Sequence, residues 1–222
     1  MCGLAGIYSH KPVATELYDS LIHLQHRGQD AAGITTYNKH MHKTKGLGLV
    51  RDIFTEKKIK RLKGNIGIAH TRYPTQGGFG HGEIQPFWTS VPYGIALAHN
   101  GNLTNYNELA KNITKKESRY LNTNSDTEVL LHLFAELLHY KNKHENDKQF
   151  FDCLCSALEN IYKNVQGAYS VVALVIGKGL VAFRDPQGIR PLVKGIRKTS
   201  NGKQDYIITS ENTMFYPLGF KP

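Results

Sequence analysis

Cysteine is scarce in this chain of 222 residues, which has only three, at positions 2, 153 and 155. So few thiols cannot form the even disulfide framework of a small secreted domain, and they exclude a four-cysteine metal or iron–sulfur site made by this chain alone. No apolar run approaches the ~18 residues that a membrane helix needs, and the first residues lack the basic and apolar regions of a signal peptide. We therefore expect a cytoplasmic protein with no membrane partner.

Acidic side chains are also in the minority, with 18 Asp and Glu residues against 28 Lys and Arg residues and a net charge of +10. Such an excess of positive charge can serve nucleic-acid binding. The cations are mostly scattered lysines, however, and the densest cluster, residues 57–63, has the pattern of the solvated side of an amphipathic segment. Because no basic and aromatic interleaving or reader motif accompanies the charge, we expect no nucleic-acid partner. A nucleic-acid binder stays as an alternative of a different class.

The remaining composition is that of a folded globular chain. Hydrophobic residues make up 40% and charged residues 21%, with 21 Gly and 8 Pro. This balance excludes collagen, a coiled coil and a largely disordered chain. No linker, internal repeat or low-complexity tract divides the sequence. The prediction is one domain over residues 1–222, long enough to bury a core.

Short apolar stretches between Gly, Pro and Asn turns predict strands along most of the chain. They are expected at residues 3–8, 31–37, 65–71, 94–98, 168–176, 180–184, 191–196 and 205–209. Residues 73–86 form a Gly-rich, Pro-containing loop, and its length makes it a candidate for function.

Apolar residues at helical spacing predict helices between these strands. A leucine stripe at positions 17, 21 and 24 marks a helix that ends near Gly28, which offers a left-handed terminus. Ser125 and Glu128 have the spacing of a capping box at the start of a helix that runs to about residue 140, and residues 150–165 form another. The order of elements indicates an α+β fold in which helices pack on mainly antiparallel sheet.

Cys2 is the residue with the most chemical promise. If Met1 is removed, this residue carries both a thiol and a free α-amine, whose reference pKa is ~7.7 to 8.0. A neutral amine can take the thiol proton directly or through a water, so nucleophile and base occur together. Alone, Cys2 is better explained as an incidental small residue after Met, so other residues must decide.

Other positions carry groups that suit an amide substrate, although each also has a simpler explanation. Asn100 and Gly101 follow a predicted strand, where they form either a tight turn or a two-donor oxyanion hole. Arg72 offers a planar fork for a carboxylate, or else an exposed salt bridge. Asp126 can pair with an ammonium group, or with the free N–H groups of a helix start. Together they describe a site for a free amino acid with an amide side chain, for which glutamine is the obvious candidate.

At these positions the sequence resembles the class II glutamine amidotransferases and, within that group, the glutaminase domain of the amidophosphoribosyltransferases. The stretches that carry the resemblance are, in chain order, CGLAGIY, LQHRGQDAAGI, GIAHTRYPTQG, QPF, GIALAHNGNLTN, NTNSDTEVLL, FRDPQGIRPL and SENTMFYPLGF. They span essentially the whole chain in the family's order and spacing. QHRGQDAAG, RYPT and FRDPQGIRPL favour this group over the related sugar-phosphate aminotransferases, which stay an alternative.

The resemblance implies the N-terminal nucleophile (Ntn) hydrolase fold, a four-layer αββα sandwich with two facing, mainly antiparallel sheets. It places catalytic roles on Cys2, Asn100, Gly101, Arg27 and Gly28, and substrate-binding roles on Arg72, Asp126, Tyr73 and Thr75. The implied reaction is attack of the thiolate on the glutamine amide, release of ammonia, and hydrolysis of the glutamyl thioester to glutamate. No metal site is expected.

The resemblance also implies partners that the chain itself does not supply. Enzymes of this group carry a second, phosphoribosyltransferase domain, and nothing in these 222 residues resembles it. The expected partners are L-glutamine and a phosphoribosyltransferase domain or subunit that accepts ammonia, and a homo-oligomer is a possible assembly. Magnesium and phosphoribosyl pyrophosphate would belong to that absent domain, so no cofactor is expected here. A catalytically silent Ntn-fold binding module is the remaining alternative.

Overall fold

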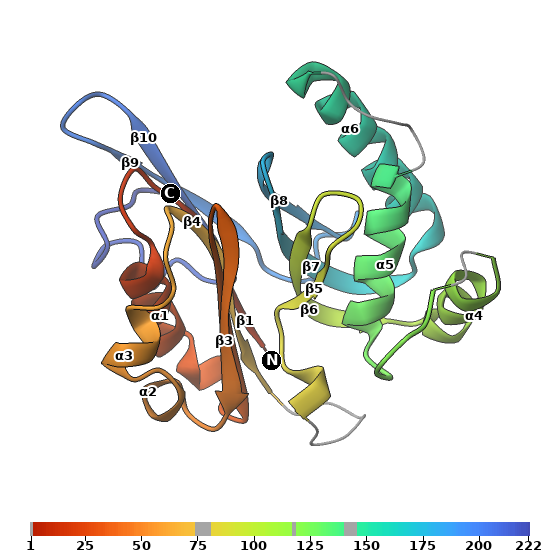
Figure 1. The fold of residues 1–222 in the computed structure, drawn as a ribbon, viewed down its shortest axis with the longest axis horizontal. Coiled ribbons are helices and arrows are strands. Elements are labelled where there is room, and N and C mark those ends of the chain that lie inside the picture. The colour runs from red at the N-terminus through yellow and green to blue at the C-terminus, as the bar shows by residue number, and fades with distance from the viewer. Residues whose placement is uncertain (1, 74–80, 117–118, 140–145) are drawn as a thin grey trace.

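Two antiparallel sheets face each other at the centre of the computed structural model (Figure 1). The structure describes residues 2–73, 81–116, 119–139 and 146–222. The larger sheet has the strand order β3-β2-β4-β1-β10-β9, formed by β1 (Gly3–Tyr8), β2 (Ala31–Asn38), β3 (His40–Leu47), β4 (Ile66–Arg72), β9 (Val193–Lys198) and β10 (Gln204–Thr209). The smaller sheet has the order β5-β6-β7-β8, formed by β5 (Phe87–Thr89), β6 (Ile95–Leu103), β7 (Gly167–Val175) and β8 (Gly179–Arg184).

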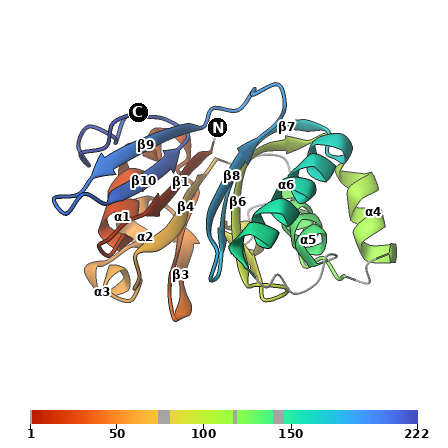
Figure 2. The same cartoon turned by 90° about the horizontal axis from the view of Figure 1, so that it is seen from above.

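Helices cover the outer face of each sheet, as Figures 1 and 2 show. On the larger sheet lie α1 (Ala14–His23), α2 (Val50–Ile53) and α3 (Glu56–Ile59); on the smaller sheet lie α4 (Tyr106–Lys116), α5 (Asp126–His139) and α6 (Asp147–Asn164). Buried apolar clusters fill the spaces between the layers, one under each helical layer and one between the sheets. This arrangement confirms the predicted α+β fold as a four-layer αββα sandwich.

Strand β6 illustrates why the sequence forms these layers. Ile95 and Leu97 belong to the cluster under the helices, whereas Ala96 and Ala98 lie in the cluster between the sheets. All of them are fully buried because a strand in the middle of such a sandwich is covered on both faces. Small alanines on the inner side leave room for the side chains of the opposite sheet.

Most of the elements missing from the sequence prediction are polar or short. β3 is an edge strand rich in His, Lys and Thr, so little apolar alternation marks it. α4 is an exception, because Tyr106, Leu109 and Ile113 lie at helical spacing and pack on the core, and the sequence prediction missed this pattern. β5 has 3 residues, and α2 and α3 have 4 each. Packing against the rest of the fold stabilises such elements, and single-sequence patterns do not register it.

Three predicted boundaries are wrong: the end of the first helix, the start of the strand at residues 191–196, and the start of the helix at residues 150–165, which is α6 and begins at Asp147. Helix α1 ends at His23, and a 3-10 turn, Gln25–Arg27, follows it. Gly28 therefore has extended backbone (φ −164°) rather than the left-handed conformation expected of it. The strand predicted at residues 191–196 begins later, as β9 at Val193.

The start of α5 differs from a capping box in one bond. The Ser125 hydroxyl accepts a hydrogen bond from the Thr127 amide at 3.3 Å, as a capping residue should. The Glu128 carboxylate, however, accepts from the amides of Asn122 (2.9 Å) and Thr123 (2.7 Å) rather than from Ser125. Glu128 thus fixes the loop that leads into α5, and with it the position of the helix start.

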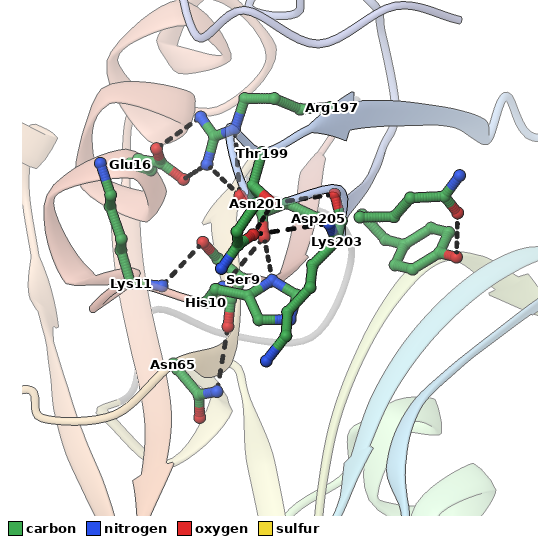
Figure 3. Close-up of polar contacts among 12 residues, drawn as sticks. Ser9, His10, Lys11, Glu16, Asn65, Arg197, Thr199, Asn201, Lys203 and Asp205 are labelled. Carbon is green, nitrogen blue, oxygen red and sulfur yellow. Dashed lines mark hydrogen bonds and ion pairs between the residues drawn. The ribbon is translucent and has the colours of Figure 1, made fainter.

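A polar cluster fixes the β9–β10 hairpin to the N-terminal part of the chain (Figure 3). The buried carboxylate of Asp205 accepts from the backbone amide and ring Nδ1 of His10 (2.9 and 2.8 Å) and from Arg197 (Nη2, 2.9 Å). Arg197 also binds Glu16 of α1 (Nη1 to Oε1, 2.7 Å) and stacks over the Phe220 ring at 4.3 Å. The cluster lies among β10, β9 and α1, so it serves stability rather than the site described below.

Asp205→Asn should lower the free energy of unfolding by about 2 kcal/mol at pH 7, because a charged acceptor of several hydrogen bonds is lost. Burial alone would raise the pKa of Asp205, but the bonds from His10 and Arg197 outweigh it and lower the pKa to about 2. An unfolded aspartate has a pKa of ~3.9, so the stabilisation is complete above that value and is lost as the pH falls towards 2.

Urea unfolding of wild type and Asp205→Asn at a series of pH values would test this. The difference between the two proteins should shrink between about pH 4 and pH 2. Asp52→Asn is the matched control, because Asp52 is an exposed carboxylate 3.7 Å from Arg51. An Asp205→Asn loss no larger than that of Asp52→Asn would contradict the prediction.

Candidate active site

The carbonyl of Cys2 is held from two sides. Cys2 immediately precedes β1, and its carbonyl oxygen accepts from Arg27 Nε at 2.9 Å and from Asn100 Nδ2 at 2.8 Å. The Tyr73 backbone amide donates to the Cys2 sulfur at 3.4 Å. Residue 2 is thus fixed by groups from three separate parts of the chain, all of them predicted site residues.

The resting state of the Cys2 thiol follows from its surroundings. Burial raises the pKa of the thiol, and the hydrogen bond from Tyr73 and the positive charges of Arg72 and Arg27 offset only part of this. A thiol with a raised pKa is almost fully protonated at neutral pH. Attack by this sulfur therefore requires a base to remove its proton.

A pocket opens beside this thiol, at the ends of β1, β4 and β6 and the start of α5. The predicted residues that line it are Cys2, Arg72, Tyr73, Gly101 and Asp126. They are widely spaced in sequence, but β1 and β4 are adjacent antiparallel strands, which places Cys2 close to Arg72. The pocket thus has a nucleophile, a cation and a carboxylate on its walls.

Asn100 and Gly101 lie inside a strand rather than after one. The strand predicted at residues 94–98 continues as β6 to Leu103, and Gly101 pairs with Tyr169 of β7. Gly101 has φ +152°, and a Cβ atom there would lie 2.0 Å from the Ala168 carbonyl oxygen. A side chain is excluded at this position, so the backbone can line the pocket. The simple tight turn considered for this Asn-Gly pair is wrong.

Gly28 is required for a different reason. A Cβ atom at Gly28 would lie 2.5 Å from the carbonyl carbon of Arg72, at the end of β4. The loop that carries Arg27 can approach β4 this closely only because residue 28 has no side chain. Gly28 does not line the pocket, but it lets Arg27 reach the Cys2 carbonyl.

Arg72 points its guanidinium into an ion pair at the pocket wall. Its Nη2 lies 2.5 Å from Oε2 of Glu83, which also lines the pocket. A bound carboxylate would compete with Glu83 for this guanidinium. Arg72 is therefore placed to hold a ligand carboxylate, and Glu83 occupies part of that position in this structure.

Asp126 is an ionised carboxylate on the pocket wall. Its Oδ2 accepts from the Leu103 amide at 3.1 Å, and its Oδ1 lies 3.4 Å from Nδ1 of His99. Burial alone would raise the pKa of Asp126, but His99 and the hydrogen bonds from the backbone amides of Leu103 and Thr127 outweigh it and lower the pKa. A carboxylate that is charged at neutral pH can hold a ligand ammonium group.

The sequence interpretation missed several residues that line the pocket: Glu83, Gln85, His99, Ser125 and Thr127. Gln85 connects two of them, because its Oε1 accepts from the His99 amide (2.6 Å) and its Nε2 donates to the Thr127 hydroxyl (2.9 Å). Gln85 lies in the QPF stretch and His99 precedes Asn100, but nothing in their spacing indicates that they support the pocket.

Some predictions fall outside this site. Thr75 lies outside the described residues. Among the residues that the structure describes, no group of His, Cys, Asp and Glu is arranged to hold a metal ion, and no helix is long and apolar enough to cross a bilayer. The sequence predicts that Cys153 and Cys155 are packed thiols on different faces of a helix; on α6 Cys153 is buried, but Cys155 is exposed.

The sequence matches the profile of the glutamine amidotransferase domain over residues 78–216. Among curated proteins, the amidophosphoribosyltransferases of Pasteurella multocida and Escherichia coli are each 46% identical to it, over 100% and 99% of this chain and 44% and 43% of their own lengths. The chain therefore spans less than half the length of these relatives.

Solved structures of the same family are also similar to this chain over nearly its whole length. The glutamine phosphoribosylpyrophosphate amidotransferase from B. subtilis, complexed with ADP and GMP, has a TM-score of 0.79 and 30% identity over 99% of this chain and 44% of that chain. A structure described as the allosteric regulatory enzyme of purine biosynthesis has a TM-score of 0.81 and 31% identity with the same coverage. A structure described as a predicted glutamine amidotransferase from Pseudomonas aeruginosa has a TM-score of 0.58 and 15% identity over 95% of this chain and 89% of that chain, and so shares the fold.

Proposed function

Because the chain belongs to the class II glutamine amidotransferase family, we propose that it hydrolyses the side-chain amide of L-glutamine to glutamate and ammonia through a thioester on Cys2. The observation that carries the proposal is the convergence of Cys2, Arg72, Gly101 and Asp126 on one pocket. A cation and an anion on its walls match the two charged ends of a free amino acid. Cys2 lines the same pocket, and its carbonyl accepts a hydrogen bond from Asn100, a proposed oxyanion donor.

Substrate binding follows from the charges of the pocket. Arg72 holds the glutamine carboxylate in competition with Glu83, and Asp126 holds the ammonium group. Both groups are at the wall of the pocket, so the amide side chain extends towards Cys2. Tyr73 lines the pocket, and we assign Tyr73 and Thr75 to substrate contact by their family positions.

The first chemical step needs a base and an oxyanion hole. The α-amine of Cys2, exposed by removal of Met1, takes the thiol proton, and the sulfur attacks the amide carbon. An Asn side-chain amide has two N–H donors, so Asn100 can bond the Cys2 carbonyl with one and the oxyanion with the other. The Gly101 amide supplies the second oxyanion donor.

Collapse of the tetrahedral intermediate breaks the C–N bond, and the protonated amine gives its proton to the departing ammonia. The glutamyl thioester that remains is attacked by water, from which the same amine removes a proton, and glutamate leaves. The balance is one glutamine and one water consumed for one glutamate and one ammonia. None of these steps requires a group outside this chain.

We assign the ammonia to a phosphoribosyl acceptor, since the relatives that match over the whole chain are amidophosphoribosyltransferases. That acceptor would be a phosphoribosyltransferase domain or subunit, with its magnesium and phosphoribosyl pyrophosphate. The identity of 46% favours it over a sugar-phosphate acceptor. Ammonia released into water near neutral pH is mostly protonated, so coupled synthesis needs a sheltered route to the acceptor.

The decisive experiment uses protein that begins at Cys2. It should release glutamate and ammonia from glutamine in a 1:1 ratio, and a diazo ketone analogue of glutamine should modify Cys2 alone, as peptide mass mapping would show. Excess glutamine should slow that modification. Protein that neither hydrolyses glutamine nor reacts at Cys2 would contradict the proposal and favour a silent binding module.

A further inference from the structure

The carboxylate of Glu211 binds Arg27, one of the two side chains that hold the Cys2 carbonyl. Arg27 is almost fully buried, and besides the Cys2 carbonyl its guanidinium binds Oε1 of Glu211 through Nη1. Glu211 follows the end of β10 and is separated from Arg27 by 184 positions. Its Oε2 also lies 3.1 Å from Nε2 of the exposed His26. Within the described residues, the acidic side chain that forms an ion pair with Arg27 is Glu211.

The position of Glu211 is itself fixed by its neighbour. Ser210 binds the main chain of Leu4 twice: its hydroxyl accepts from the Leu4 amide at 3.0 Å, and its own amide donates to the Leu4 carbonyl at 3.1 Å. Residues 210 and 211 therefore keep a constant relation to the first residues of β1. The segment that carries the Glu211 carboxylate is therefore hydrogen-bonded to β1, the strand that follows Cys2.

The Cys2 carbonyl connects this ion pair with the oxyanion donor. A carbonyl oxygen has two lone pairs, and here Arg27 Nε and Asn100 Nδ2 occupy them. The direction of that carbonyl sets both the backbone of the residue that carries the thiol and the rotation of the Asn100 amide. A shift of Arg27 would therefore disturb the attacking atom and the oxyanion hole together.

We propose that Glu211 is a positioning residue that, through Arg27, holds the Cys2 carbonyl and the Asn100 amide in the orientation that amide hydrolysis needs. The proposal rests on the proposed glutaminase function. Glu211 does not line the pocket, so it acts on the reacting groups and not on glutamine itself. An uncharged residue at this position would leave the buried Arg27 without its counter-ion and free to turn away from Cys2.

The test compares Glu211→Gln with wild type, both beginning at Cys2. We expect kcat for glutamine hydrolysis to fall by about 10- to 100-fold, because small displacements of reacting groups cost that much, while KM changes less than about threefold. Glu211→Asp keeps the charge and should retain more of kcat than Glu211→Gln. Arg27→Gln combined with Glu211→Gln should lose no more than Arg27→Gln alone, since both act on one contact.

A second measurement does not depend on hydrolysis. The side-chain NH₂ signals of Asn100 in a ¹⁵N–¹H spectrum, assigned by their disappearance in Asn100→Ala, should shift in Glu211→Gln. Glu136→Gln is the matched control: it breaks another ion pair of largely buried side chains, Arg119 Nη2 to Glu136 Oε2 at 2.8 Å, on the helix layer. It should leave kcat and the Asn100 signals unchanged.

The outcomes separate this proposal from the proposed function. Wild-type protein that fails to hydrolyse glutamine contradicts the glutaminase proposal, whereas the Asn100 signals still report on the contact with Glu211. A kcat of Glu211→Gln within twofold of wild type, or unshifted Asn100 signals, overturns the positioning role. If Glu211→Gln does not fold, the same two measurements on Glu211→Ala, which also removes the carboxylate, decide against the same thresholds.

Discussion

A chain in which Cys2 is replaced by alanine is expected to release no glutamate above the uncatalysed background, a loss of more than about a thousandfold in kcat. The sulfur is the atom that would form the thioester, and no other thiol is near the pocket: Cys153 is buried and Cys155 exposed on α6. A coupled glutamate assay would measure the loss. Cys155→Ala is the matched control and should retain full activity.

The amine of the same residue is expected to matter almost as much. Protein that keeps Met1 or carries an N-terminal acetyl group has an intact thiol but no basic amine on Cys2, and general-base catalysis is worth about 100- to 10,000-fold. Because burial raises the pKa of this thiol, its spontaneous ionisation cannot replace the base at neutral pH. Intact-mass spectra paired with the activity of each form would measure this dependence.

Two results would contradict this view of residue 2. Cys2→Ala protein with measurable turnover would show that the nucleophile lies elsewhere. Full activity in a form whose mass includes Met1 would show that another group acts as the base. Glutamine binding by the blocked form, measured calorimetrically, separates a lost base from a blocked pocket, since Arg72 and Asp126 are unchanged in it.

Local sequence patterns could predict the strands and helices whose burial is periodic, and they did so for the centre of both sheets. They did not predict β3, whose residues are polar because it is an edge strand that pairs only with β2. The apolar residues of α4, Tyr106, Leu109 and Ile113, do have helical spacing, so this helix could have been predicted. Local patterns placed Asn100 after a strand, whereas the pairing of Gly101 with Tyr169 continues that strand through it. That pairing depends on β7, which no local pattern near residue 100 reveals.

In the candidate site, too, some residues could be predicted from the sequence and others could not. Cys2, Asn100, Arg72 and Asp126 could be proposed because each residue type suits one part of a single substrate. Gln85 and Glu211 could not, because their importance lies in what they touch: the His99 amide in one case and Arg27 in the other. A glutamine or glutamate at a given position carries no sign of a partner that is 14 or 184 positions away.

Asn100→Ala is expected to bind glutamine nearly as well as wild type and to hydrolyse it about 100- to 1000-fold more slowly, which is the usual effect of removing one oxyanion donor. Binding should persist because the change leaves Arg72 and Asp126 in place, the two residues proposed to hold the charged ends of glutamine. Steady-state kinetics should therefore show a large fall in kcat with little change in KM.

The comparison with neighbouring amides makes the test specific. Asn102→Ala removes an exposed amide from the same strand and should leave turnover unchanged. Asn100→Asp keeps the size of the side chain but replaces the donor to the Cys2 carbonyl, 2.8 Å away, with an acceptor, so it should be at least as slow as Asn100→Ala. Unchanged turnover in Asn100→Ala would remove Asn100 from the oxyanion hole, and the second donor would then have to be sought among the other groups that face the thiol.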